Sequence, residues 1–144
     1  MGERKRKFSA VVTAVERYLP DRIVTNSDLE KIIDTSDTWI RERTGIRERR
    51  ILDGLPTSFM ATAVGERLLR QRDMDPADVD LIIVATVTPD MVFPATACLV
   101  QDRIGARRAW AFVLSAACSG FVYAVVTGSQ FSSGRSLDGG NACS

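Results

Sequence analysis

The alternation of hydrophobic and polar positions along the chain changes its period several times, and each period predicts an element. Runs rich in β-branched and apolar residues predict strands at 8–15, 79–88 and 109–114. The middle run is almost continuously apolar, which is typical of a strand buried on both faces of a parallel sheet. The weaker alternation of residues 46–51 predicts an edge strand.

Apolar residues at helical spacing predict helices at 25–33, 35–45, 57–74, 95–105 and 119–131. Asn26 or Ser27 is the expected N-cap of the first, because short polar side chains accept hydrogen bonds from the first free N–H groups of a helix. Thr35 or Ser36 is the expected cap of the second, which Gly45 should end.

Strand and helix follow one another in turn from residue 79 to 131, which predicts the α/β class. The periodicity stops at Ser132, where such a sheet should next supply a strand. We therefore expect an incomplete domain over residues 1–133, cut within its fold, followed by a divergent and disordered tail over residues 134–144.

The composition narrows the classes of function. A chain of 144 residues with 26% charged residues and a net charge of +1 is typical of one globular domain with no field that favours nucleic acid. No apolar run approaches the ~20 residues that span a membrane, so we expect a cytoplasmic protein without a membrane segment. The cysteines at 98, 118 and 143 have no metal-binding spacing, so neither a metal site nor a disulfide framework is expected.

Cys118 is the first candidate for chemistry. It lies between a predicted strand and a predicted helix, so unpaired N–H groups and the positive end of the helix dipole should favour its thiolate. Its small neighbours permit a tight turn, and a backbone N–H there could donate to a developing oxyanion. The alternative is a buried structural cysteine, and the local context leaves both open.

Trp39 and Arg43 are the second candidate. They are four residues apart on one predicted helix, hence on one face, where an indole and a guanidinium can hold a planar ring such as adenine. In the alternative, Trp39 packs on the core while Arg43 faces water. The spacing alone favours this second interpretation.

Three stretches together resemble one family. "DTSDTWIRERTGIRERR" (34–50), "VATVTPDMVFPATACLVQDRIG" (84–105) and "AACSGF" (116–121) resemble segments of the β-ketoacyl-acyl-carrier-protein synthase III family of condensing enzymes. The resemblance runs in order over about residues 8–133. It implies the N-terminal half of a thiolase-like fold, with a mixed sheet, helices, and the nucleophile at a strand-to-helix turn.

The resemblance also implies roles for single residues. Cys118 corresponds to the nucleophile that takes an acyl group from acyl-CoA. Trp39 and Arg43 correspond to the residues that stack on the CoA adenine. Thr35 corresponds to a polar contact at the same opening of the CoA-binding site. Phe93 corresponds to an aromatic residue that crosses a homodimer interface and lines the partner's acyl pocket. The second substrate is malonyl-acyl-carrier protein, and no cofactor is expected because acyl-CoA is a substrate.

The family's nucleophile works with a histidine and an asparagine, which the resemblance places in the C-terminal half of the fold. This sequence has no histidine, and Asn26 and Asn141 match no family motif. Cys98 falls in a family helix as a small core residue, and Cys143 lies outside the match. Two further hypotheses therefore stay open: a residual CoA-binding or dimer-forming module, and a gene remnant that does not fold.

Overall fold

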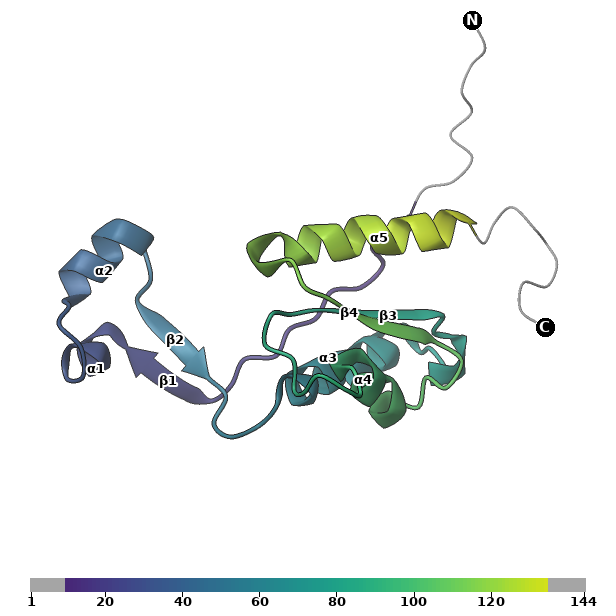
Figure 1. Ribbon diagram of the computed structural model, residues 1–144, viewed down its shortest axis with the longest axis horizontal. Coiled ribbons are helices and arrows are strands. Elements are labelled where there is room, and N and C mark those ends of the chain that lie inside the picture. Colours follow the sequence, from purple (N-terminus) through teal and green to yellow (C-terminus); the bar gives the residue numbers. More distant parts are fainter. Residues whose placement is uncertain (1–9, 135–144) are drawn as a thin grey trace, which may run out of the picture. The chain divides into compact units, whose positions relative to one another are not determined.

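The computed structural model describes residues 10–134 (Figure 1). These residues divide into two compact units: one is Arg17–Pro56, and the other combines the residues on both sides of it. The predicted boundary at residue 133 stays a prediction, and residues 135–144 of the predicted tail lie outside the described part.

The unit Arg17–Pro56 is a β-hairpin with two short helices between its strands. Its elements are β1 (Arg22–Thr25), α1 (Asn26–Glu30), α2 (Asp37–Thr44) and β2 (Glu48–Ile51). The strands are antiparallel, in a register that runs from Arg22 opposite Ile51 to Thr25 opposite Glu48. The predicted helix at 35–45 and strand at 46–51 are confirmed, whereas β1 was missed.

The start of α1 corrects the predicted cap. Thr25, rather than Asn26 or Ser27, is the N-cap: its hydroxyl accepts the N–H of Asp28 at 3.2 Å, and the Asp28 carboxylate accepts the N–H of Thr25 at 3.0 Å. This reciprocal capping box satisfies two backbone donors. Asn26 does not cap because its buried amide is used in contacts with other elements.

The second unit is an α/β layer arrangement. Its elements are α3 (Thr57–Arg72), the 3-10 turn η1 (Pro76–Asp78), β3 (Leu81–Ala85), α4 (Thr96–Ile104), β4 (Trp110–Leu114), the 3-10 turn η2 (Ala117–Ser119) and α5 (Gly120–Gly134). Strands β3 and β4 are parallel, with Leu81 opposite Trp110 and Ala85 opposite Leu114. α3 and α4 cover one side of this pair, and α5 covers the other (Figure 1). The helices at 57–74, 95–105 and 119–131 and both strands are confirmed.

The tightest packing of this unit surrounds α4. Ala97 and Ala106 are completely buried, and Val100 is nearly so. Gly65 of α3 faces Ile104 so closely that a Cβ at Gly65 would stand 3.4 Å from its side chain. Small residues therefore let α3 and α4 pack closely together. The strand pair of β3 and β4 packs against α4.

The strand predicted at 8–15 is wrong for residues 10–15, which have no regular secondary structure. Val11 and Val12 are 75% and 72% exposed. A strand persists only when a neighbour accepts and donates its backbone hydrogen bonds, and in the described part β3 pairs with β4 alone. β3, which the sequence predicted to be buried on both faces, is only half-buried among the described residues.

Within residues 10–134, no helix has both the length and the apolar character needed to cross a membrane.

Candidate active site

Cys118 occupies the middle of η2, directly between the end of β4 and the first residue of α5. Its side chain is exposed. The first N–H groups of α5 have no partner within the helix, so their dipoles are directed toward the segment that carries the thiol. Cys118 is thus not buried among the described residues, and its role as a nucleophile stays a prediction.

The turn that presents Cys118 has an unusual backbone. Ala117 has φ +43°, in the left-handed region that costs a residue with a Cβ about 1–2 kcal/mol. The N–H of Ser119 donates to the Ala116 carbonyl at 3.0 Å, and that of Gly120 donates to the Ala117 carbonyl. The sequence predicted a tight turn here, but only the structure shows that Ala117 carries its strain.

Cys118 also borders an open apolar groove of about 860 Å³ within the same unit. Residues of α3, β3 and α5 line the groove, among them Ala85, Phe121 and Val125. An apolar surface beside a nucleophile suits an aliphatic acyl group.

The other cysteines differ from Cys118. Cys98 is half-buried in α4, and its thiol donates to the Ala111 carbonyl at 3.7 Å, which agrees with a packing role. Cys143 lies outside the described residues.

Trp39 and Arg43 lie one turn apart on α2 and both are exposed, Trp39 by 57%. Trp39 therefore does not pack on the core, contrary to the interpretation that the spacing alone favoured. Within residues 10–134, Arg43 has no ion pair or hydrogen bond through its side chain. Thr35 is half-buried one residue before the N-cap Ser36, whose hydroxyl accepts the N–H of Trp39 at 3.1 Å.

The position of α2 is set by one buried amide. Asn26 is 1% exposed and donates to the Asp37 carboxylate at 2.7 Å and to the Ile46 carbonyl at 2.8 Å. Its oxygen accepts a hydrogen bond from Arg49. Asn26 thus holds the first residue of α2, the segment that follows the helix, and β2.

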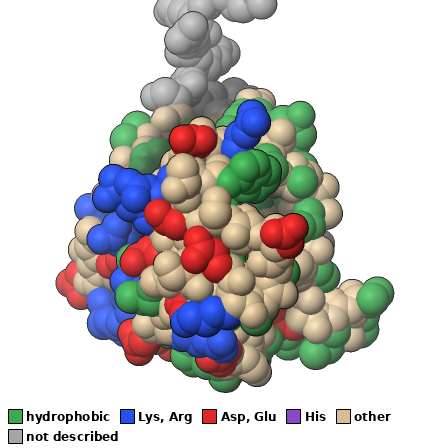
Figure 2. All heavy atoms as spheres, turned by 90° about the vertical axis from the view of Figure 1, so that its left-hand side faces the viewer, with side chains coloured by type: hydrophobic (Ala, Val, Ile, Leu, Met, Phe, Trp, Pro, Cys, Tyr) green, Lys and Arg blue, Asp and Glu red, His purple; other side chains and the backbone are tan. Residues whose placement is uncertain are grey.

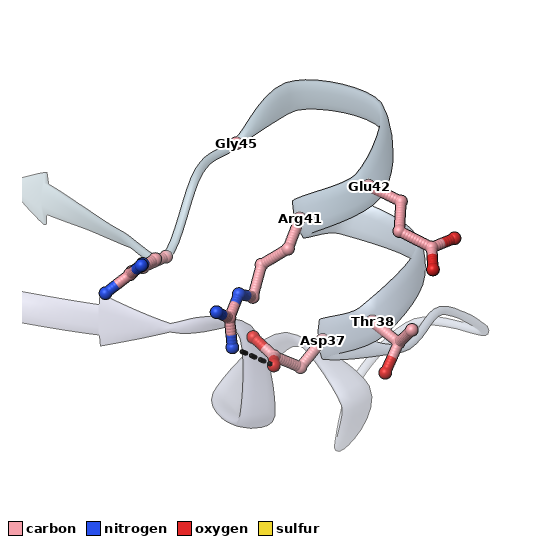
Figure 3. A pocket seen from close by; sticks show the side chains of 6 residues that line it. Asp37, Thr38, Arg41, Glu42 and Gly45 are labelled. Atoms are coloured by element: carbon pink, nitrogen blue, oxygen red, sulfur yellow. Dashed lines mark hydrogen bonds and ion pairs between the residues drawn. The ribbon is translucent and has the colours of Figure 1, made fainter.

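A polar pocket of about 390 Å³ lies beside the same helix (Figure 3). Asp37, Arg41 and Gly45 line it, and Arg41 donates to Asp37 at 3.4 Å. The hydrogen bond from Asn26, together with Arg41 and the charge of Arg47, holds the pKa of Asp37 below its usual value. In Figure 2, basic and acidic side chains are intermixed on the visible face, so this view shows no broad patch of one sign.

Phe93 lies in the loop between β3 and α4 and is 86% exposed. A side chain of this size and exposure is available to another molecule. Among the residues that the structure describes, no group of three or more His, Cys, Asp or Glu side chains could hold a metal ion.

The candidate residues fall into two groups. Trp39, Arg43 and Thr35 belong to the unit Arg17–Pro56, and Cys118 and Phe93 belong to the other unit. Sequence reasoning did not find the positioning role of Asn26. The only local signal was the capping box formed by Thr25 and Asp28, which frees Asn26 for other contacts.

Comparisons with known proteins agree with this geometry. No protein-family model matches the chain. The β-ketoacyl-[acyl-carrier-protein] synthase III of Chlorobium phaeovibrioides is 58% identical over 126 residues, which are 86% of this chain and 38% of that protein. The crystal structure of the 3-oxoacyl-[acyl-carrier-protein] synthase III of Aquifex aeolicus superposes with a TM-score of 0.79 at 50% identity, over 82% of this chain and 38% of that one.

A further solved structure, the priming β-ketosynthase of the R1128 polyketide biosynthetic pathway, is 37% identical with a TM-score of 0.74. The region of similarity covers 78% of this chain and 34% of the ketosynthase chain. The parallel strands, the covering helices and the exposed cysteine at the strand-to-helix turn define a thiolase-like condensing-enzyme fold, of which this chain forms part. The chain belongs to the β-ketoacyl-[acyl-carrier-protein] synthase III family. It spans about 38% of the length of its curated relative from Chlorobium phaeovibrioides.

Proposed function

We propose that this chain supplies the nucleophile and the CoA-binding helix of a β-ketoacyl-acyl-carrier-protein synthase III. The observation that carries the proposal is the exposed Cys118 at the start of α5, in a chain 58% identical to a synthase of that name. The open apolar groove that Cys118 borders is compatible with an acyl group as the species transferred.

The first step is an acyl transfer. The Cys118 sulfur attacks the thioester carbonyl of acyl-CoA, the new sulfur–carbon bond forms, and CoA leaves as its thiolate, which takes up the proton that Cys118 lost. We assign the stabilisation of the negative charge that develops on the carbonyl oxygen to backbone N–H groups of the turn that carries Cys118, other than those of Ser119 and Gly120, which donate to Ala116 and Ala117.

The second step is a decarboxylative condensation. Malonyl-acyl-carrier protein loses CO₂, and the resulting carbanion attacks the acyl-enzyme carbonyl and releases the Cys118 thiolate. In the family this step uses a histidine and an asparagine, and this sequence contains no histidine. Members of a catalytic unit act together, so we expect the 144-residue chain to perform acyl transfer with little or no complete condensation.

Recognition of acyl-CoA is assigned to α2. The exposed indole of Trp39 and the guanidinium of Arg43 present one face to an adenine ring, and Thr35 adds a polar contact before the helix. No further cofactor takes part, because acyl-CoA is itself a substrate. Phe93 is assigned to a homodimer contact, where it lines the acyl pocket of a second copy.

The experiment that tests this proposal is acylation of the purified chain by acetyl-CoA, followed by intact-mass and peptide mass spectrometry. One acetyl group on the Cys118 peptide is expected, and the Cys118→Ser variant should remain unmodified. The Cys98→Ser variant is the matched control and should be acylated at the wild-type rate. Acylation that persists in Cys118→Ser would contradict the proposal.

A second candidate is a CoA-binding module without transfer activity. The exposure of both Trp39 and Arg43 favours it independently of Cys118, because these residues are positioned within the unit Arg17–Pro56 alone. CoA binding without acylation of Cys118 would support this second candidate over the enzyme.

A further inference from the structure

The helix α2 carries the proposed CoA contacts, yet apolar packing anchors it at one position. Of its eight residues, all within the described part of the chain, only Ile40 is buried, with 5% of its surface exposed. A helix is normally oriented by an apolar stripe that runs over several turns, and one buried side chain does not prevent rotation about the helix axis. The direction in which Trp39 and Arg43 project therefore depends on polar contacts.

These polar contacts meet at the buried amide of Asn26. Its N–H groups donate to the Asp37 carboxylate at 2.7 Å and to the Ile46 carbonyl at 2.8 Å, and its oxygen accepts from Arg49 of β2. Asp37 is the first residue of α2, and Ile46 follows its C-cap Gly45. One side chain, 1% exposed, thus holds both ends of α2 and links them to β2.

Further contacts fix the beginning of α2. The Glu30 carboxylate accepts the N–H of Asp37 at 2.6 Å, and the Ser36 hydroxyl accepts the N–H of Trp39 at 3.1 Å. The side chains of Asp37 and Arg41 point toward each other on one side of the helix (Figure 3). Trp39 follows Asp37 by two positions, about 200° around the helix, so it projects from the opposite side. The side of α2 that Asn26 holds is thus turned away from the side that carries the exposed indole.

We propose that Asn26 is a positioning residue for CoA, whose buried amide sets the orientation in which α2 presents Trp39 and Arg43 to the adenine ring. The inference rests on the CoA role of α2 in the proposed function. An aspartate side chain has the shape of asparagine but no N–H groups, so at position 26 it would leave the Ile46 carbonyl without its donor. It would also place a second carboxylate against Asp37.

The test uses the full chain in the Trp110→Phe background, in which Trp39 is the fluorophore. Asn26→Asp removes both amide donors and keeps the volume of the side chain. Ser27→Asp adds the same charge at the next position, which is exposed, and is the matched control for repulsion of the CoA phosphates. The double variant Asn26→Asp/Asp37→Asn returns an N–H donor to this pair of side chains.

Asn26→Asp should weaken the binding of CoA, measured by quenching of Trp39, about fivefold through the lost hydrogen bonds. The concentration of acetyl-CoA that half-saturates acylation of Cys118 should rise by the same factor, with an unchanged maximal rate, because Cys118 belongs to the other unit. Ser27→Asp should match the background chain, and the double variant should bind CoA more tightly than Asn26→Asp.

Hydrogen exchange measured by mass spectrometry separates positioning from a loss of folding. In Asn26→Asp, exchange should rise in residues 37–46, whereas the paired residues 22–25 and 48–51 should stay protected. An equal rise in β1 and β2 would mean that Asn26 stabilises the whole unit, and would overturn the positioning role.

The CoA titration gives the remaining outcomes. Unchanged affinity in Asn26→Asp, or an equal loss in Ser27→Asp, would also overturn the positioning role. A double variant that binds no more tightly than Asn26→Asp would overturn the part assigned to the contact with Asp37. A background chain whose Trp39 is not quenched by CoA would instead overturn the CoA role of α2 in the proposed function, and this inference with it.

Discussion

Gly120 lies so close to Ala85 that a Cβ added to it would stand 3.4 Å from the Ala85 Cβ. This contact joins the first residue of α5 to the last residue of β3. Cys118 precedes Gly120 by two positions, so the packing of the helix start on the strand end fixes where the thiol emerges. A residue without a side chain is suited to position 120, because the two backbones approach closely there.

Gly120 can be compared with Gly128, a second glycine of α5, in a test of stability. A Cβ at Gly128 would meet only the Ile83 Cδ1 at 3.9 Å, which is an ordinary contact. Gly128→Ala should therefore raise the free energy of unfolding by up to ~1 kcal/mol through helix propensity. Gly120→Ala should give a smaller gain, since its new methyl group meets the Ala85 Cβ at 3.4 Å, the short end of van der Waals contact, and position 120 is only the first residue of the helix. Thermal unfolding followed by circular dichroism compares them, and equal gains in both would contradict the close approach.

Ala117 tests the strain of the turn. Glycine adopts positive φ without a Cβ penalty, so Ala117→Gly should be neutral or stabilising by up to about 1 kcal/mol. Ala117→Val should be destabilising, because a β-branched residue is disfavoured at positive φ. Urea unfolding measures both. A valine variant as stable as the glycine variant would show that the left-handed conformation is absent in solution.

Cys118 should be alkylated by iodoacetamide several-fold faster than Cys98. Cys118 is exposed at a helix start, whereas Cys98 is half-buried and hydrogen-bonded to Ala111. Time-resolved peptide mass spectrometry at neutral pH compares the two thiols within one sample. Faster labelling of Cys98 would contradict the proposed nucleophile.

CoA should quench the fluorescence of Trp39. A stacking contact on an exposed indole contributes on the order of 1 kcal/mol, so a dissociation constant in the millimolar range is expected. The titration is done in the Trp110→Phe background, which leaves Trp39 as the fluorophore. Arg43→Ala should abolish the quenching.

Arg41→Ala is the control for that titration. It removes Arg41, which lies on the same helix as Arg43 and forms an ion pair with Asp37. Quenching lost in both variants to the same degree would mean that charge, rather than the Trp39–Arg43 pair, attracts CoA.

Acid should destabilise the unit Arg17–Pro56 in a definite range. The hydrogen bond from Asn26 and the neighbouring arginines lower the pKa of Asp37 from 3.8, and Lys31 and Thr25 lower that of Asp28. A carboxyl group whose pKa is lower in the folded state than in the unfolded state stabilises the protein at pH values above its unfolded-state pKa. This contribution is lost as the pH falls through its folded-state pKa. Stability should thus be constant above about pH 5 and decline below about pH 4.

Trp39 fluorescence in the Trp110→Phe background measures this acid transition. Asp37→Asn should show a shallower decline, because the substituted amide does not titrate. An identical pH profile in Asp37→Asn would show that Asp37 does not contribute to acid sensitivity.

The sequence by itself determined the elements whose signals are local. The sequence predicted that α2 is capped by Thr35 or Ser36 and ended by Gly45, and the structure has Ser36 and Gly45 at its two ends, each acting within one turn of the helix. The four-residue spacing of Trp39 and Arg43 follows from the helix alone. Cys118 could likewise be placed between a strand and a helix from the apolar runs on either side of it.

Tertiary structure decided the features that depend on distant partners. β1 is four residues long and exists because residues 48–51 supply its hydrogen bonds, whereas residues 10–15 have strand-like composition without a ladder partner in the described part. The interactions of Asn26 with Asp37 and Ile46 cross the unit, and the contact of Asp90 with Ser58 joins a loop to a helix that precedes it. Local patterns carry no information about such pairings, because their free energy arises only when the chain brings the two groups together.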